Sequence, residues 1–213
     1  MAARARSPRS AKPGPDPDTS APPNERRNRD SEVMAAAIRL IYEKGYVGAS
    51  LQDVANEVGV LKGSLYYYFA SKEDLLVRIM KESHVQAEEI YREIAATDLP
   101  PSEKLSKFVA ALMTWYLEHT EQVSIYINER HRLTGERLEE VEAEGRRFER
   151  MIHDFIRDAK KAGDIDDQID TKLAVQFIVG ALNSVPMWKK WEGASPDEVA
   201  QQFAQTTLKS IAR

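Results

Sequence analysis

The stretch "GYVGASLQDVANEVGVLKGSLYYYFASKEDLL", residues 45–76, decides the fold of this chain because it holds two short helical patterns separated by a tight turn. In the first pattern, residues 51–58 carry apolar side chains at helical spacing. Ser50 precedes it and Asp53 follows three residues later, which is typical of a capping box at a helix N-terminus. The second pattern occupies residues 62–69, after the turn "GVL". Two helices of about eight residues joined by a glycine-containing turn predict a helix-turn-helix.

The second of these helices is predicted to bury one face and to leave another outside. A helix turns by roughly 100° per residue, so Leu65 and Phe69 share an inward face, and Leu61 falls on the same side. Tyr67 lies about 200° from Leu65 on this wheel. Three consecutive tyrosines therefore cannot all enter one core, and we expect at least Tyr67 to face a partner outside the unit.

The outward half of this helix has an unusual composition for a surface that meets only water. Gly63 and Ser64 share it with Tyr67, and Tyr66 and Tyr68 flank it, whereas solvent-facing helix positions usually carry Glu, Lys or Gln. Small residues near a helix N-terminus allow a phosphate to approach, and tyrosine hydroxyls bond phosphates or base edges. We therefore predict a DNA-reading surface, with packing against neighbouring helices as the alternative for Tyr66 and Tyr68.

The rest of the chain is predicted to form a second, larger helical unit. No stretch alternates with a period of two residues, so the fold class is all-α, with a three-helix helix-turn-helix domain followed by a larger helical bundle. Residues 1–25 hold six of the ten prolines and are predicted to be a disordered tail. Residues 26–75 form the helix-turn-helix domain, and residues 76–213 the bundle. The arginines of residues 26–29 are candidates for a DNA-contacting arm.

Composition and charge narrow the function classes. The formal net charge of −4 argues against a protein that coats nucleic acid indiscriminately, but not against a local DNA-reading surface. There is no cysteine, no apolar run long enough to cross a membrane and no secretory signal, so we expect a cytoplasmic protein without membrane contact. The four histidines fall on separate predicted helices, and there is no glycine-rich phosphate loop or nucleophile elbow. We therefore expect no catalytic site, no metal site and no cofactor.

Residues 45–76 as a whole resemble the N-terminal DNA-binding domain of TetR-family transcriptional regulators. The resemblance rests on Gly45-Tyr46, Ser50, "VANEVGV", "KGSLYYYF" and "SKEDLL". It implies a homodimer that binds a palindromic operator in double-stranded DNA and leaves it when a small-molecule effector enters the C-terminal domain. By the habit of the family, the protein would be a repressor. A helical protein-interaction module without DNA binding is the alternative function.

The resemblance also implies roles for single residues. The predicted DNA-contacting residues are Ser50, Lys62, Gly63, Ser64, Tyr66, Tyr67, Tyr68 and Lys72. Among them, Ser50 and Lys72 match phosphate-contacting positions at two helix N-termini, and Tyr68 stands where His or Tyr is usual. Leu61 departs from the family pattern, which often has Ser or Thr in this turn, and so removes a hydroxyl that could bond a phosphate.

Aromatic and methionine side chains gather on the middle helices and suggest an effector pocket. The predicted pocket residues are Trp115, Tyr116, Tyr126, Arg130, Phe148, Met151, Phe155 and Trp188, and Trp191 belongs to the same aromatic group. Such a lining suits an apolar or aromatic ligand. The alternative is ordinary core, because stripes of this kind at helical spacing are often core.

Arginines near the same segments could receive an anionic head. "NERHRL" (128–133) and "RRFER" (146–150) offer cations for a carboxylate, a phosphate or a coenzyme A ester. The alternative is a solvated helix face held by Glu–Arg pairs at 142–146, 129–132 and 144–147. The stretch "QVSIYINERHRL" also resembles the corresponding region of actinobacterial regulators of lipid and sterol breakdown that respond to acyl-CoA esters.

The last two predicted helices are candidates for the dimer contact. Residues 173–185 are apolar on nearly all sides, and the helix over residues 196–211 carries one broad apolar face. The family resemblance implies that both pair with their two-fold mates in a four-helix bundle. Closing the monomer's own core is the alternative. A dimer would place two recognition helices about one turn of DNA, roughly 34–36 Å, apart.

Overall fold

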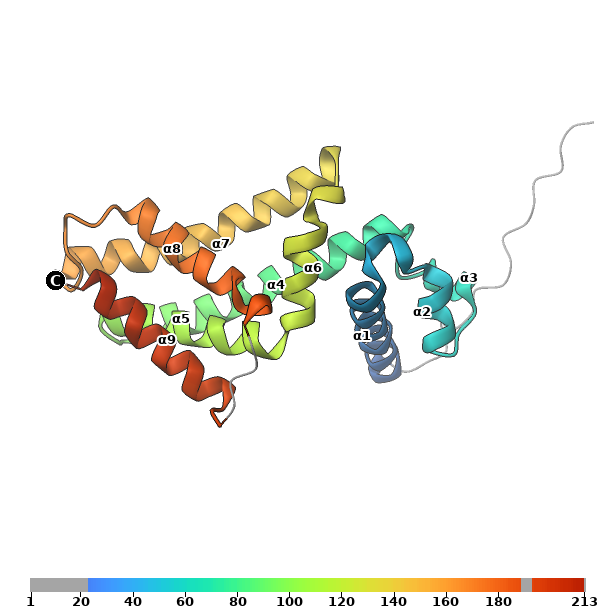
Figure 1. Ribbon diagram of the computed structural model, residues 1–213, viewed down its shortest axis with the longest axis horizontal. Coiled ribbons are helices and arrows are strands. Elements are labelled where there is room, and N and C mark those ends of the chain that lie inside the picture. Colours follow the sequence, from blue (N-terminus) through green and yellow to red (C-terminus); the bar gives the residue numbers. More distant parts are fainter. Residues whose placement is uncertain (1–22, 189–192, 213) are drawn as a thin grey trace, which may run out of the picture.

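The computed structural model describes residues 23–188 and 193–212. Within these residues, nine α-helices and two short 3-10 helices form an elongated molecule, with a small helical unit at one end and a larger bundle at the other (Figure 1). The all-α prediction is confirmed. Residues 1–22 of the predicted tail, the side chains of Arg26 and Arg27, and Trp191 lie outside the described part.

The small unit contains the predicted capping box and a second helix cap. Ser50 Oγ accepts the Asp53 N–H at 3.1 Å, and Asp53 Oδ2 accepts the Ser50 N–H at 2.8 Å, so the capping box forms. Ser71 caps the next helix by accepting the Asp74 N–H at 3.1 Å. Gly45 interrupts the first helix with a φ of 71°, a conformation that glycine adopts without strain. The helices of the unit are α1 (Pro23–Gly48), α2 (Leu51–Glu57), α3 (Lys62–Leu65) and the first turns of α4 (Lys72–Ala95).

The second helix of the motif differs from the prediction in two ways. It spans Lys62–Leu65 instead of residues 62–69, and it continues as a turn in which the N–H groups of Tyr68 and Phe69 reach Leu65 O at 2.9 and 3.0 Å. The Tyr68 bond spans three residues, and bonds of this i→i+3 type often tighten the last turn of a helix. The prediction that Leu61 faces inward is wrong. This residue is the N-cap, with extended backbone (ψ 141°), and its side chain is 80% exposed.

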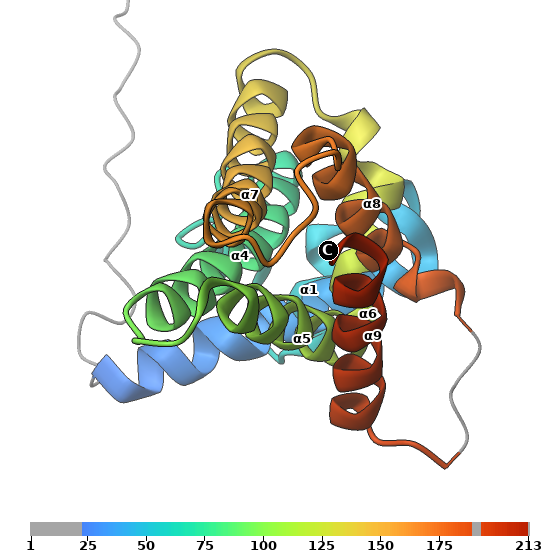
Figure 2. The ribbon, with the colours of Figure 1, turned by 90° about the vertical axis from the view of Figure 1, so that its left-hand side faces the viewer.

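The larger bundle surrounds a second core. Viewed from its free end, α4, α5 and α7 lie around a common interior with α8 and α9 (Figure 2). The long α7 ends where Gly163 adopts a φ of 83°. None of the helices in the described ranges is both long and apolar enough to cross a bilayer. The bundle helices are α5 (Pro101–Glu118), α6 (Thr120–Glu129), α7 (Gly135–Ala162), α8 (Thr171–Asn183) and α9 (Pro196–Ile211), with 3-10 helices at Arg130–Arg132 and Val185–Met187.

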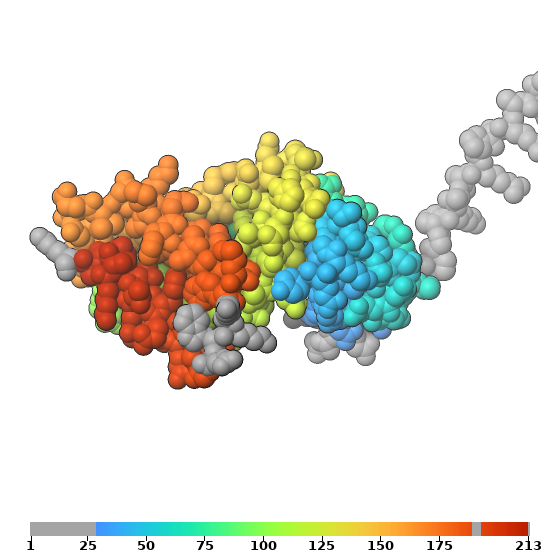
Figure 3. Space-filling view, viewed as in Figure 1, coloured from blue at the N-terminus to red at the C-terminus, as the bar shows by residue number. Residues whose placement is uncertain are grey.

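The two cores meet along α4 and α6. The first turns of α4 bury Leu76 and Met80 in the small unit, whereas Ala87 of the same helix belongs to the core of the bundle. Ile125 of α6 also packs into the core of the small unit. The boundary predicted at residue 75 therefore falls inside one continuous helix. Figure 3 shows the small unit as a lobe that joins the bundle through α6.

Candidate DNA interface and ligand pocket

The predicted reading surface separates into exposed and packed tyrosines. Tyr66 and Tyr67 are 52% and 62% exposed, which is unusual for side chains of this size. Tyr68 is half-buried against the core of the small unit, with its ring centroid 6.2 Å from that of Phe69. A Cβ added to Gly63 would meet no heavy atom within 4 Å. The fold itself does not require glycine there, so the open space is available to a partner.

The polar members of the predicted set differ in how free they are. Lys62 is exposed at the start of α3, and Ser64 is half-buried behind it. Lys72 is held inside the unit, because its Nζ lies 4.3 Å from the centroid of the Tyr46 ring and 3.5 Å from Val47 O. Burial lowers the pKa of Lys72. Ser50 is also engaged, since its hydroxyl donates to Asp53 at 2.6 Å.

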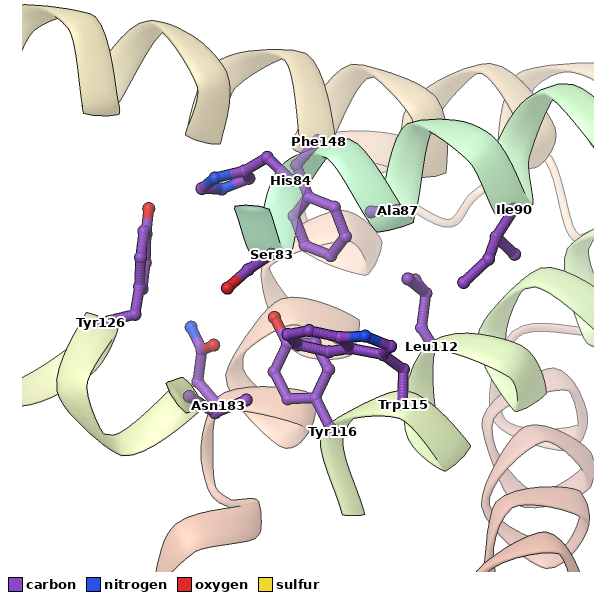
Figure 4. Close-up of a pocket in the computed structure, with 11 residues that line it drawn as sticks. Ser83, His84, Ala87, Ile90, Leu112, Trp115, Tyr116, Tyr126, Phe148 and Asn183 are labelled. Carbon is purple, nitrogen blue, oxygen red and sulfur yellow. The ribbon is translucent and has the colours of Figure 1, made fainter. Parts of the chain in front are cut away.

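A small cavity lies in the bundle between α4, α5, α6, α7 and α8 (Figure 4). Its volume of about 20 Å³ is enough for roughly one water molecule. Four predicted effector residues, Trp115, Tyr116, Tyr126 and Phe148, line it. The other lining residues are Ser83, His84, Ala87, Ile90, Leu112, Val123 and Asn183.

A wider and more polar cleft of about 370 Å³ adjoins this inner cavity and shares five of its lining residues. Arg130, the fifth predicted effector residue, lines the cleft together with Arg146, Glu142 and Glu149. The guanidinium carbon of Arg130 lies 6.0 Å from the centroid of the Tyr126 ring. The cleft thus combines charge at its surface with an aromatic inner wall.

The three predicted Glu–Arg pairs form. Arg146 lies 3.8 Å from Glu142, Arg147 lies 3.2 Å from Glu144, and Arg132 pairs with Glu129. The alternative of a solvated face therefore holds for these three arginines. Exposed pairs of this kind contribute little stability, about 0–1 kcal/mol each.

Three predicted effector residues, Met151, Phe155 and Trp188, line neither of these cavities. Phe155 is buried with its ring centroid 4.9 Å from Tyr91 and 5.2 Å from Phe108, and Met151 packs against the same core. Trp188 donates its indole N–H to Ser184 Oγ at 2.8 Å. Periodicity identifies the inward face of a helix, but it does not separate side chains that fill a core from those that line a space within it.

Sequence reasoning missed the polar residues of the inner cavity. Ser83 and His84 lie on α4, on the face that continues with Ala87 and Ile90, and a polar pair inside an apolar helical stripe was the available signal. His84 places Nδ1 3.1 Å from Met80 O, and burial lowers the pKa of this histidine. The His84 ring is therefore favoured in its neutral form, with the proton on Nδ1. In the described ranges, no three His, Asp or Glu side chains gather as a metal site would require.

Two polar links join the cavity helices to the small unit. On α6, Glu129 follows the cavity residue Tyr126 by one turn, and its Oε1 accepts the Tyr46 N–H at 3.1 Å. On α7, Arg137 donates through Nε to Asp74 at 2.9 Å and through Nη1 to Glu73 at 3.0 Å. The hydrogen bond from Arg137 lowers the pKa of Asp74. Both links reach backbone or side chains next to the helix-turn-helix.

The last two helices differ in what covers them. The apolar face of α9, with Val199, Ala204 and Ile211, is buried and packs largely on α5 of the same chain, as the core-closing alternative expects. In contrast, α8 leaves Leu173 and Phe177 68% and 54% exposed. An apolar face therefore remains open on α8.

Comparison with known proteins extends these observations to nearly the whole chain. Residues 33–79 match the family model of bacterial regulatory proteins of the tetR family, and residues 98–211 match that of the tetracyclin repressor-like C-terminal domain. The HTH-type transcriptional repressor KstR2 of Mycolicibacterium smegmatis is 27% identical over 197 residues, which cover 92% of this chain and 95% of that protein. The structure of the ketosteroid transcriptional regulator KstR2 of Mycobacterium tuberculosis aligns with a TM-score of 0.77 and 26% identity, over 87% of this chain and 95% of that one. That of AibR in complex with isovaleryl coenzyme A and operator DNA aligns with a TM-score of 0.72 and 24% identity, over 86% and 97%.

The first family model covers the helix-turn-helix unit. The second lies in the bundle and by itself covers more than half of the chain. The match to the tetR-family model over residues 33–79 excludes the alternative of a protein-interaction module without DNA binding. The chain therefore belongs to the TetR family and is a DNA-binding transcriptional regulator, not an enzyme.

Proposed function

We propose that this protein is a repressor that binds a palindromic operator as a homodimer and is released when a small molecule enters the bundle. One observation carries the DNA-binding end: Tyr66 and Tyr67 stand exposed beside Gly63, around which the fold leaves open space. Tyrosine hydroxyls and the exposed Lys62 would contact phosphates and base edges there. The KstR2 relative is named a repressor, which supports the direction of regulation.

The dimer is proposed to form around α8. Its exposed Leu173 and Phe177, with Gly180 in the same helix, offer an apolar strip on which a second copy of the helix would pack. A Cβ added to Gly180 would meet no heavy atom within 4 Å, so a neighbouring helix has room to approach. A two-fold axis is also what a palindromic operator requires.

The effector is proposed to be an apolar or aromatic molecule that carries an anionic end, with an acyl-CoA ester as the leading class. Trp115, Tyr116, Tyr126 and Phe148 would hold its apolar part, and Arg130 in the outer cleft would face its charge. The solved relative AibR, described with isovaleryl coenzyme A, supports this class. Arg146 is a weaker candidate because Glu142 already lies 3.8 Å away.

Release is proposed to follow from the small size of the inner cavity. A ligand larger than about one water molecule would have to push apart the helices that line it, including α4 and α6. Both helices contact the small unit, α4 as its last helix and α6 through Glu129, which accepts the hydrogen bond donated by the Tyr46 N–H. Moving them would change the separation of two recognition helices in a dimer. A ligand shifts this balance only by its difference in affinity for the two arrangements.

The test is a fluorescence anisotropy titration with an operator selected from a genomic fragment library. Tyr67→Ala and Gly63→Ala are expected to weaken operator binding at least about fivefold, since one lost base contact costs roughly 1–3 kcal/mol. Gly63→Ala should not lower the melting temperature, because its Cβ has free space and alanine favours helix. Tyr42→Ala, a tyrosine of α1 that is 48% exposed, serves as the matched control. Equal operator affinity in all four proteins would contradict the proposal.

A further inference from the structure

The hydroxyl of Ser83 is a buried polar group without a partner. Its Oγ is shielded from solvent and forms no hydrogen bond in the described part of the molecule. A serine inside a helix commonly bonds its hydroxyl to the carbonyl three or four residues back. Leaving a buried hydroxyl unpaired is costly, so its state needs a physical explanation.

The structure supplies the explanation, because both local acceptors already serve other side chains. The carbonyl of Ile79, four residues back, accepts from Gln122 Nε2 of α6 at 2.8 Å. The carbonyl of Met80, three residues back, lies 3.1 Å from His84 Nδ1. A carbonyl oxygen has two lone pairs, and in a helix one of them already serves the backbone ladder. The Ser83 hydroxyl can therefore form a hydrogen bond only toward the cavity.

Two other uncharged polar groups meet Ser83 in that space. Figure 4 shows the hydroxyls of Ser83 and Tyr116 and the amide of Asn183 pointing toward one another, from α4, α5 and α8. Burial raises the pKa of Tyr116, so its hydroxyl keeps its proton and remains a donor. Among the described residues, none of those that line this inner cavity is Lys, Arg, Asp or Glu, whereas the outer cleft contains four charged side chains. The inner polar group is therefore neutral and the outer one is charged.

We infer that Ser83, Tyr116 and Asn183 form a recognition site for an uncharged oxygen, a ketone or a hydroxyl, carried by the buried part of the effector. The inference rests on the proposed effector pocket and specifies the chemistry of its inner end. Each of these three groups can donate a hydrogen bond, which suits an oxygen acceptor and disfavours a plain hydrocarbon that would leave the Ser83 hydroxyl unpaired. An ionised carboxylate is disfavoured because no cation of the described part of the chain lines the inner cavity to offset its desolvation. The charged end of the ligand would stay in the outer cleft.

The test compares a matched ligand pair, octanoyl-CoA and 7-oxooctanoyl-CoA, by titration of the tryptophan fluorescence of the full chain. Ser83→Ala and Asn183→Ala are each expected to weaken binding of the oxo compound about threefold to tenfold, the worth of one hydrogen bond, and to change octanoyl-CoA binding by less than about twofold. Ser124→Ala is the control, because this hydroxyl of α6 accepts from Asn128 at 3.0 Å and lines neither cavity. Its effect on both ligands should be small.

A second measurement separates recognition from folding. Since the Ser83 hydroxyl has no partner, Ser83→Ala without ligand should keep or raise the melting temperature. A clear fall would mean that the hydroxyl bonds within the protein, and would overturn the inference. Equal loss for both ligands in Ser83→Ala, or no loss for either, would also overturn it, including the case in which a retained water satisfies the hydroxyl.

Operator release distinguishes this inference from the function on which it rests. If both ligands bind alike and both release operator DNA, the oxygen site is wrong and the repressor proposal stands. If the oxo compound is preferred through Ser83 but operator affinity does not change, the oxygen site stands and ligand-driven release fails. Binding of neither compound at millimolar concentration would refute the oxygen site and the acyl-CoA class of effector.

Discussion

Replacing Glu129 with alanine should weaken the join between the bundle and the helix-turn-helix unit. The change removes the acceptor of the Tyr46 N–H, which lies 3.1 Å from Glu129 Oε1, and it also removes the pair with Arg132. The Glu129 side chain is only 13% exposed, so water replaces the lost acceptor poorly.

The magnitude follows from the kind of bond. A hydrogen bond to a charged group contributes about 1.5–3 kcal/mol, and leaving the Tyr46 N–H unsatisfied adds to the loss. For a chain of this size, a loss of about 2 kcal/mol lowers the melting temperature by roughly 4–8 °C. Arg132→Ala is the matched control because it removes the ion pair and leaves the hydrogen bond in place. It should cost less than about 1 kcal/mol, as its own side chain is 38% exposed.

The assay has two parts. Thermal unfolding gives the stability of wild type, Glu129→Ala and Arg132→Ala, and operator titrations with and without 7-oxooctanoyl-CoA give the response to ligand. We expect Glu129→Ala to retain ligand binding but to show a smaller ligand-induced drop in operator affinity, because α6 no longer accepts the hydrogen bond from the Tyr46 N–H. If Glu129→Ala had the same melting temperature as Arg132→Ala and kept the full ligand response, the role assigned to the hydrogen bond between Tyr46 and Glu129 would be refuted.

Three further outcomes are expected. Phe155→Ala should destabilise the protein by about 3–5 kcal/mol in urea unfolding, because the ring is core against Tyr91 and Phe108. A mild loss of stability with a selective loss of ligand affinity would instead indicate that Phe155 contacts the ligand. His84 should make stability depend on pH, because burial lowers its pKa in the folded protein below the unfolded value of about 6.5. Below that value the unfolded chain binds more protons than the folded one, so the free energy of unfolding falls as the pH drops. Unfolding at pH 7.5 and 5.5 should show a smaller difference in His84→Phe than in wild type, and an equal difference would contradict this. Leu61→Ser should leave the melting temperature unchanged because the side chain is 80% exposed, while operator binding should tighten if the hydroxyl gains a phosphate contact; unchanged binding would show that position 61 does not reach DNA.

The sequence specified the elements that local chemistry controls. The capping box at Ser50 depends on neighbouring residues, and it forms as predicted. The cap at Ser71 and the breaks at Gly45 and Gly163 are equally local. The Glu–Arg pairs along the helices form for the same reason, since their partners lie one turn apart. The outward position of Tyr67 also follows from the turn of a single helix.

Tertiary structure alone decided which inward side chains fill a core and which border a space. Phe148 and Phe155 lie two turns apart on one face of α7, yet one lines the inner cavity and the other packs between Tyr91 and Phe108. That difference depends on how far neighbouring helices stand from each position, which periodicity does not encode. The unpaired hydroxyl of Ser83 has the same origin. Its local acceptor at Ile79 is taken by Gln122, a residue 43 positions away in sequence, and only the packing of α6 against α4 brings that amide into place.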